Sequence, residues 1–204
     1  MKSSRSRFLD IRGLRLHLRE WGREGAPRLY LLHGWMDASA SFQFMVDALA
    51  GDWHVVAPDW RGFGLSAWSH ADGYWYPDYF ADLDAILRAV EGEDAAPVRL
   101  VGHSMGGNVA LMYAGIRPAR VGRVVALDAF GLPDRPAGEA PGRYQKWLRE
   151  LTEVPRPRIY PSLDALAERL RRDNPRLDAA RAGWLAETLA QPDDGDGGRG
   201  WRIA

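Results

Sequence analysis

Residues 98–107 have the sequence Val-Arg-Leu-Val-Gly-His-Ser-Met-Gly-Gly. The apolar run Val98–Val101 predicts a short buried strand, and the segment from Asn108 to Ile116, which has few helix breakers, predicts a helix. A Gly-x-Ser-x-Gly pattern between a strand and a helix is typical of a nucleophile elbow, in which a serine on a sharp, strained turn exposes its hydroxyl. By itself the pattern also arises by chance in a glycine-rich chain, so the other segments must agree with it.

The glycines of this segment have a steric explanation. Side chains two positions to either side of Ser104 would collide in such a turn, and Gly102 and Gly106 remove them. Gly107 then allows the helix to pack close to the sheet. We therefore expect the Ser104 hydroxyl at the positive end of a helix, with the N–H of Met105 able to bind an oxyanion.

Composition excludes several classes of protein. The 204 residues suffice for one domain with a sizeable core, or for a domain with a small appendage. Basic and acidic side chains are equal at 27 each, so no overall field attracts nucleic acid or an anionic membrane. The absence of cysteine excludes disulfides, thiolate catalysis and cysteine-ligated metals. No apolar run approaches the ~18 residues of a membrane span.

The N-terminus is basic and serine-rich, and no apolar signal core follows it. We expect Met1–Arg7 to be a disordered start rather than a signal peptide, and the protein to be cytoplasmic.

Hydrophobic patterns before Gly131 alternate between strands and helices. Phe8–Glu20 predicts a hairpin that turns at Gly13, because three leucines alternate there with Arg15, His17 and Arg19 as in a half-buried strand. Further strands are expected at Leu29–Leu32, His54–Pro58 and Arg123–Leu127, and further helices at Ser39–Ala50 and Tyr76–Val90. The last of these helices carries Asp82, Asp84 and Glu91, which we assign to its solvent face.

This order predicts an α/β fold with a mostly parallel sheet, helices on both of its faces and an antiparallel hairpin at one edge. Ligands of such sheets bind at the carboxyl ends of the strands. Four polar residues come at or just after strand ends, namely His33, Asp59, Ser104 and Asp128.

After Gly131 the pattern changes. Proline and glycine are frequent up to Gly142, and apolar residues with helical spacing then predict helices at Tyr144–Leu151, Leu163–Leu170 and Leu177–Leu189, with no strand. The segment Gln191–Gly200 predicts an exposed loop. Its aspartates (Asp193, Asp194, Asp196) lack the spacing of an EF-hand, so we expect a solvated loop and no metal site.

The motifs together resemble those of the α/β-hydrolase fold family, within its cap-bearing group. The resemblance rests on three segments, in order: residues 31–35 (Leu-Leu-His-Gly-Trp), residues 59–66 (Asp-Trp-Arg-Gly-Phe-Gly-Leu-Ser) and residues 102–107 (Gly-His-Ser-Met-Gly-Gly). It implies an incomplete α/β-hydrolase core over residues 1–132 and a partial helical cap over residues 133–204.

The resemblance also implies roles for individual residues. Ser104 would be the nucleophile, and the backbone N–H groups of Trp35 and Met105 would form the oxyanion hole, with the Trp35 indole facing the pocket. Residues that surround the pocket or support it would be His33, Gly34, Asp59, Arg61 and His103, of which Asp59 and Arg61 would fix the loop beside the oxyanion site. Neither His33 nor His103 matches the position of the general base.

One part of the family pattern is missing. A serine needs a base to accept its proton, and in this fold the order is serine, acid, histidine. All five histidines precede Ser104. Asp128 holds a position where some members keep the acid, although a carboxylate is also a common turn residue. We expect an N-terminal piece of a longer enzyme, with one sheet edge open and with little or no hydrolytic activity in this form.

The function predicted is that of a serine hydrolase, which acts without a cofactor on a small, largely apolar ester or related molecule. The same constellation serves cofactor-free haloperoxidases and acyltransferases, whereas a haloalkane dehalogenase is disfavoured because its nucleophile is a carboxylate. The alternative is a non-catalytic binding protein, or a remnant, on the same fold. A small molecule is the expected partner, nucleic acid is not, and the oligomeric state stays open.

Overall fold

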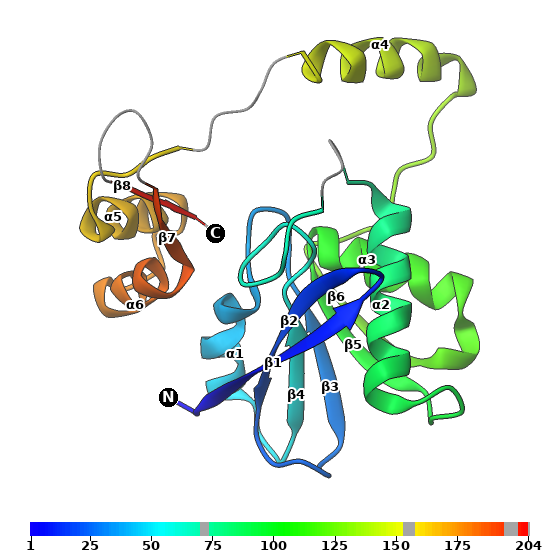
Figure 1. Ribbon diagram of the computed structural model, residues 1–204, viewed down its shortest axis with the longest axis horizontal. Coiled ribbons are helices and arrows are strands. Elements are labelled where there is room, and N and C mark those ends of the chain that lie inside the picture. Colours follow the sequence, from blue (N-terminus) through cyan, green and yellow to red (C-terminus); the bar gives the residue numbers. More distant parts are fainter. Residues whose placement is uncertain (70–73, 153–157, 194–199, 204) are drawn as a thin grey trace.

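A six-stranded sheet forms the centre of the protein (Figure 1), as the computed structural model of residues 1–69, 74–152, 158–193 and 200–203 describes it. The strand order is β1-β2-β4-β3-β5-β6. The strands are β1 (Ser4–Ile11), β2 (Leu14–Trp21), β3 (Arg28–Leu32), β4 (His54–Pro58), β5 (Val98–His103) and β6 (Val121–Leu127).

The pairing of the strands confirms the predicted α/β architecture. Strands β3, β4, β5 and β6 run parallel, while β1 and β2 form an antiparallel hairpin that joins the sheet along β4. The prediction of a disordered start is wrong for Ser4–Arg7, because these residues pair with Leu18–Trp21 across the hairpin. The basic, serine-rich composition of this segment did not predict a strand, because the strand is stabilised by backbone hydrogen bonds to β2 and not by its own side chains.

Helices cover both faces of the sheet. The helical elements of this part are η1 (Ser39–Phe42), α1 (Gln43–Ala48), α2 (Tyr76–Glu91), α3 (Met105–Ile116) and η2 (Pro118–Arg120). Side chains of β3 alternate between the two faces. Tyr30 and Leu32 share a core with α2 and α3, whereas Leu29 and Leu31 share another with η1 and α1. Burial on both faces explains why the parallel strands are continuously apolar.

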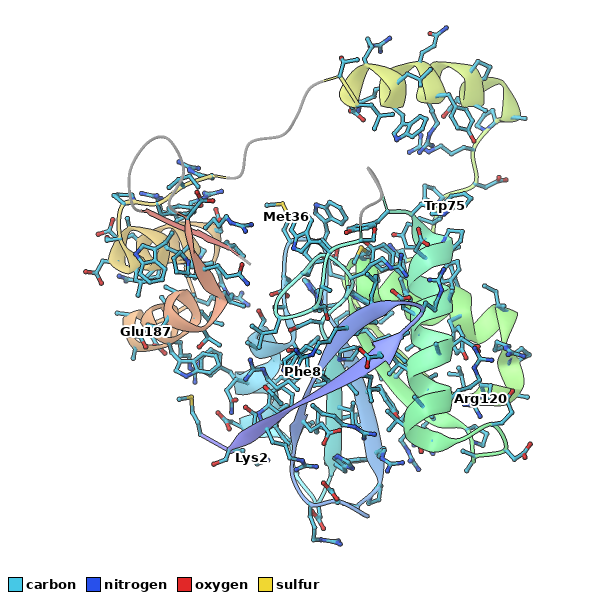
Figure 2. All side chains as sticks on the ribbon, in the orientation of Figure 1. Lys2, Phe8, Met36, Trp75, Arg120 and Glu187 are labelled. Carbon is cyan, nitrogen blue, oxygen red and sulfur yellow. The ribbon has the colours of Figure 1, made fainter. Side chains whose placement is uncertain are left out.

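The helices expected after Gly131 are present as α4 (Ala140–Glu150), α5 (Leu163–Asp173) and α6 (Ala179–Leu189). A short 3₁₀ helix, η3 (Ala137–Glu139), precedes α4. Helix α6 packs on α5 around Leu166 and Ala186, and on η1 through Leu189. Helix α4 contains no buried residue and stands apart from the sheet (Figures 1 and 2).

Two further strands correct the prediction for the end of the chain. β7 (Ala190–Asp193) pairs antiparallel with β8 (Gly200–Ile203), so Gln191–Asp193 do not form the expected loop. Asp193 forms an ion pair with Arg202, in which Oδ2 of Asp193 lies 3.2 Å from Nε of Arg202. Each of these strands has four residues, too few for an alternation of polar and apolar side chains to predict it. Asp194 and Asp196 lie outside the described residues.

Strand β6 is the edge of the sheet opposite the hairpin. Its Val125 and Leu127 are 51% and 38% exposed. The predicted open edge of the sheet is therefore found here. Within the part of the chain that the structure describes, none of the helices is both long and apolar enough to span a membrane.

Candidate active site

Ser104 lies on the turn between β5 and α3. Its backbone has φ +50° and ψ −115°, and it is the N-cap residue of α3. A positive φ is uncommon for a residue with a side chain, and such strained positions cluster at functional sites. The helix N-terminus adds a partial positive charge beside the partly exposed serine.

The steric role predicted for the elbow glycines is confirmed. A Cβ atom on Gly102 would overlap the backbone of Gly106, and one on Gly106 would overlap the carbonyl oxygen of Leu32. A Cβ on Gly107 would lie 2.5 Å from the Cβ of Ala129. These close approaches bring α3 against β3 and β5, so the turn at Ser104 depends on them.

The loop after β3 approaches the elbow closely. A Cβ on Gly34 would lie 3.3 Å from the Ser104 Cβ and 3.1 Å from His103 Nδ1. In the described part of the chain, the backbone N–H groups of Trp35 and Met105 donate to no acceptor. Both groups are therefore available to an incoming oxygen. The Trp35 indole is 56% exposed and packs edge-on against Phe63, with the ring centres 5.1 Å apart.

His33 is buried and its ring is fully engaged. Its Nδ1 donates to the carbonyl of Gly34 at 2.7 Å, and its Nε2 accepts the Trp60 N–H at 2.9 Å. Burial lowers the pKa of His33, which favours the neutral ring that this arrangement needs. His33 thus joins the loop after β3 to the loop after β4, and within the described part of the chain its ring does not bond to Ser104.

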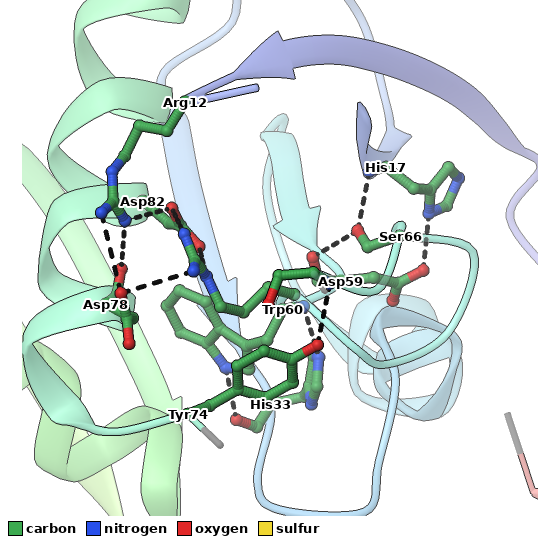
Figure 3. A network of polar contacts seen from close by, with 11 residues as sticks. Arg12, His17, His33, Asp59, Trp60, Ser66, Tyr74, Asp78 and Asp82 are labelled. Carbon is green, nitrogen blue, oxygen red and sulfur yellow. Dashed lines mark hydrogen bonds and ion pairs between the residues drawn. The ribbon is translucent and has the colours of Figure 1, made fainter. Parts of the chain in front are cut away.

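Asp59 is the buried centre of the loop after β4 (Figure 3). Its carboxylate accepts the N–H groups of Ser39 and Leu65 at 2.6 and 2.9 Å, and His17 Nδ1 at 2.7 Å. Burial by itself raises the pKa of Asp59, but the His17 hydrogen bond and the neighbouring histidines outweigh it and hold this pKa at about 2. Asp59 is therefore a carboxylate that ties the loop to the hairpin.

His17 corrects the hairpin prediction. The alternation with leucines placed it on the polar side of a half-buried strand, but it is fully buried. Phe8 packs against its ring with centres 5.1 Å apart, and Asp59 satisfies its Nδ1. The residue type was the sequence signal for this burial. A histidine can be buried as a neutral ring, whereas Arg15 and Arg19 on either side of it keep their charge.

Arg61 and Asp82 form a buried ion pair. Asp82 accepts Arg61 Nε at 2.6 Å and Nη2 at 2.7 Å, and it also accepts Arg12 Nη1 at 3.0 Å. The Asp82 hydrogen bond raises the pKa of Arg61. Figure 3 shows Asp82 and Asp78 on the side of α2 that faces this loop. Arg61 thereby fastens the loop to α2.

The assignment of acidic residues on α2 to the solvent face is therefore wrong. Asp82 follows the buried Tyr79 by three positions and precedes the buried Ile86 by four, so helical spacing alone places it on the buried side. Asp84 and Glu91 are also engaged, because they accept hydroxyl hydrogen bonds from Tyr113 at 2.8 Å and from Tyr30 at 2.6 Å.

Within the described residues, no base forms a hydrogen bond with the Ser104 hydroxyl. His17 and His33 are engaged as above, and His54 bonds to Arg5 at 2.9 Å. His103 is exposed, and its side chain has no hydrogen-bond partner in the part of the chain described. His70 lies outside the described residues.

Asp128 lies beside the elbow backbone. It follows Leu127, whose carbonyl accepts the N–H of Ser104 at 2.9 Å. Its own backbone has φ +50° and its side chain is exposed. Among the residues described, no histidine bonds to it.

A large open hollow lies away from Ser104 and the residues around it. It has a volume of about 910 Å³ and separates Tyr74 and Trp75 from helix α4. Its other lining residues are Arg135, Glu139, Ala140, Arg143, Tyr144, Lys146, Trp147 and Glu150. Ser104 does not line it, so the elbow and this hollow are separate features.

Several known proteins are similar to this chain in sequence and in fold. A sequence model of the family described as alpha/beta hydrolase fold matches residues 27–171. A serine hydrolase-like protein of Danio rerio is 32% identical over 183 residues, and epoxide hydrolase A of Mycobacterium tuberculosis is 34% identical over 147 residues. A thioesterase domain from the curacin biosynthetic pathway superposes with a TM-score of 0.85 over 98% of this chain, at 28% identity.

These matches cover the relatives only in part. The Danio rerio match includes 86% of this chain but 55% of the relative, and the Mycobacterium tuberculosis match includes 69% of this chain but 42% of the relative. The thioesterase match includes 70% of that domain. The chain thus spans about half the length of the curated relatives it matches.

Proposed function

Because this chain belongs to the α/β-hydrolase fold family, we propose that it is a serine hydrolase in which Ser104 attacks a small ester-like substrate. The observation that carries the proposal is the backbone of Ser104, held at φ +50° at the N-terminus of α3. The N–H groups of Trp35 and Met105 lie beside it and have no acceptor among the described residues. The serine hydrolase-like relative supports the choice of serine chemistry.

The chemistry proposed is acyl transfer in two steps. Ser104 Oγ bonds to the acyl carbon while its proton passes to a general base, and the carbonyl oxygen becomes an oxyanion that Trp35 and Met105 N–H groups stabilise. The alcohol then leaves with a proton, and water releases the acid from the acyl-enzyme by the same route. Gly34 permits the approach of Trp35, while His33, His103, Asp59 and Arg61 surround or support this site.

The general base is proposed to come from residues that this sequence does not contain. All its histidines precede Ser104, and the described ones do not contact the hydroxyl. Asp128 is the candidate in this chain for the residue that orients such a base. General bases contribute about 10²–10⁴ in rate, so the 204-residue chain by itself is expected to hydrolyse esters at least about 100-fold more slowly than a complete enzyme.

The direct test is labelling of the native protein, isolated from its source, with a fluorophosphonate. The tryptic peptide of residues 100–120 contains Ser104 as its single serine, so an adduct on it identifies the nucleophile. We expect stoichiometric labelling of this peptide, which Ser104→Ala abolishes. An active native protein whose Ser104 peptide remains unlabelled would contradict the proposal.

A second experiment tests the missing base. The 204-residue chain and the native protein are compared with the same p-nitrophenyl ester, and circular dichroism verifies that both are folded. A rate in the 204-residue chain equal to that of the native protein would show that its own residues supply the base. Product analysis with water, alcohols or peroxide as acceptor distinguishes a hydrolase from an acyltransferase or haloperoxidase.

A non-catalytic binding protein is the second candidate, because Ser104 Oγ has no basic partner among the described residues. This role predicts that small esters or acids raise the melting temperature of the native protein without turnover. Turnover of any of these ligands that Ser104→Ala eliminates would exclude this candidate.

A further inference from the structure

A chain of hydrogen bonds links a serine, a histidine and an aspartate far from Ser104 in sequence. Asp59 Oδ2 accepts from His17 Nδ1 at 2.7 Å, and His17 Nε2 lies 2.8 Å from the Oγ of Ser6. This is the order of contacts found in Ser-His-Asp nucleophilic sites. We propose that Ser6 is a second activated serine, which accepts a phosphonyl or acyl group from reactive phosphonates and activated esters.

The hydrogen-bond partners of His17 determine its tautomer. Asp59 is a buried carboxylate with a pKa held at about 2, so it can only accept, and His17 Nδ1 must carry a proton. In the tautomer with Nδ1 protonated, the imidazole lone pair is on Nε2, which lies 2.8 Å from the hydroxyl oxygen of Ser6. The Ser39 and Leu65 N–H groups hold Asp59 in place, so the histidine is fixed in the tautomer that a base needs.

Burial separates the base from water and leaves the nucleophile accessible. His17 is fully buried and Phe8 packs against its ring, whereas Ser6 on the edge strand β1 is exposed. A reagent can therefore reach Ser6 Oγ while water does not compete for Nε2. The catalytic part of the arrangement resides in a β-hairpin, which holds the side chains more rigidly than a loop.

A cationic side chain adjoins the proposed nucleophile. Ser6 is paired with Arg19 across the hairpin, and Phe8 with His17, so these side chains share one face. Arg19 Nη1 donates to Ser4 Oγ at 3.1 Å, and its buried Nε has no hydrogen-bond partner in the described structure. The charge of Arg19 stabilises negative charge that develops on an electrophile bound at Ser6.

The reaction with a fluorophosphonate balances as follows. Ser6 Oγ forms a bond to phosphorus as its proton moves to His17 Nε2, and the P–F bond breaks to release fluoride. The proton then leaves with the fluoride, and the product is a neutral phosphonate ester of Ser6. An activated ester such as p-nitrophenyl acetate reacts in the same sense and releases p-nitrophenolate.

Ser4 provides the matched control. It lies on the same strand and the same face, it is exposed, and it bonds to Arg19 instead of a histidine. The experiment uses the 204-residue chain with Ser104→Ala, a fluorophosphonate, and tandem mass spectrometry of the chymotryptic peptide of residues 1–8, which separates Ser6 from Ser3 and Ser4. General base assistance predicts labelling of Ser6 at least about 100-fold faster than Ser4.

Two further measurements complete the test. In denaturing urea the Ser6 to Ser4 ratio is expected to fall to about one, because the selectivity depends on the folded hairpin. His17→Gln is expected to abolish the preference while Ser6→Ala removes the adduct without transferring it to Ser4. Equal labelling of Ser6 and Ser4 in the folded chain overturns the proposal, whether or not the His17 variant folds. The Ser104→Ala background makes this outcome independent of the function proposed for the elbow.

Discussion

Removal of the Asp82 carboxylate tests the buried ion pair that joins the loop after β4 to α2. The Asp82 side chain has no exposed surface and that of Arg61 is 7% exposed. Asp82→Ala would leave the Arg61 guanidinium buried without its bidentate partner, while Arg61 retains Asp78 at 3.4 Å.

The loss of stability can be worked from these contacts. Breaking a buried ion pair by removing one partner costs about 3–5 kcal/mol. Arg12, the other partner of Asp82, is 40% exposed and regains water, so the lower end of this range applies, about 3 kcal/mol. For a chain of 204 residues this corresponds to a decrease in Tm of roughly 6–12 °C.

Asp78→Ala is the control. The Asp78 side chain is 24% exposed, and its ion pairs with Arg61 and Arg12 are 3.4 and 3.7 Å long. Its removal should cost about 1 kcal/mol or less. Urea unfolding followed by tryptophan fluorescence measures both free energies. Equal losses for the two variants, or a loss below about 1 kcal/mol for Asp82→Ala, would refute the reasoning.

Three other predictions concern the elbow, the loop after β4 and helix α5. Gly106→Ala should destabilise the chain by about 1–3 kcal/mol, because the added Cβ would overlap a carbonyl oxygen. Gly115→Ala should stabilise α3 by about 0.5–1 kcal/mol, because nothing lies within 4 Å of the added Cβ. Urea unfolding measures both changes. The pKa of Asp59 is lower in the folded state, about 2, than the ~3.9 of an unfolded chain, so its contribution to stability is complete above about pH 4 and is lost as pH falls through 2. The stability difference between the wild type and Asp59→Asn should therefore shrink over that interval in acid titrations, and a constant difference would contradict this. Ser162→Ala removes the side chain that accepts the Ala165 N–H at 3.1 Å. Hydrogen exchange should then show that the free energy of opening of α5 is lower by about 1 kcal/mol, whereas Ser162→Asp should leave it unchanged.

Local patterns predicted most of the α/β core. Buried parallel strands are short apolar runs, and helices have a period of 3.6, so the elements from β2 to β6 follow from spacing. His17 and Asp82 were misplaced for a different reason. Each is a polar side chain that can be buried because a partner distant in sequence satisfies it: Asp59 is 42 residues from His17, and Arg61 is 21 from Asp82. For Asp82 the helical spacing of α2 already indicated the buried side.

The sequence alone indicated the elbow, since Gly102, Ser104 and Gly106 are neighbours and a Cβ atom on Gly102 would overlap the backbone of Gly106. Only the tertiary structure decided what surrounds them: that Gly34 brings the Trp35 loop within contact of Ser104, and that Ser6, His17 and Asp59 meet in one hydrogen-bonded chain. The physical reason is that side-chain periods act within one element, whereas contacts between elements depend on how strands pair and helices pack. The β1–β2 register and the end of β4 bring Ser6, His17 and Asp59 within hydrogen-bonding distance, and the spacing of these residues in the sequence does not predict this.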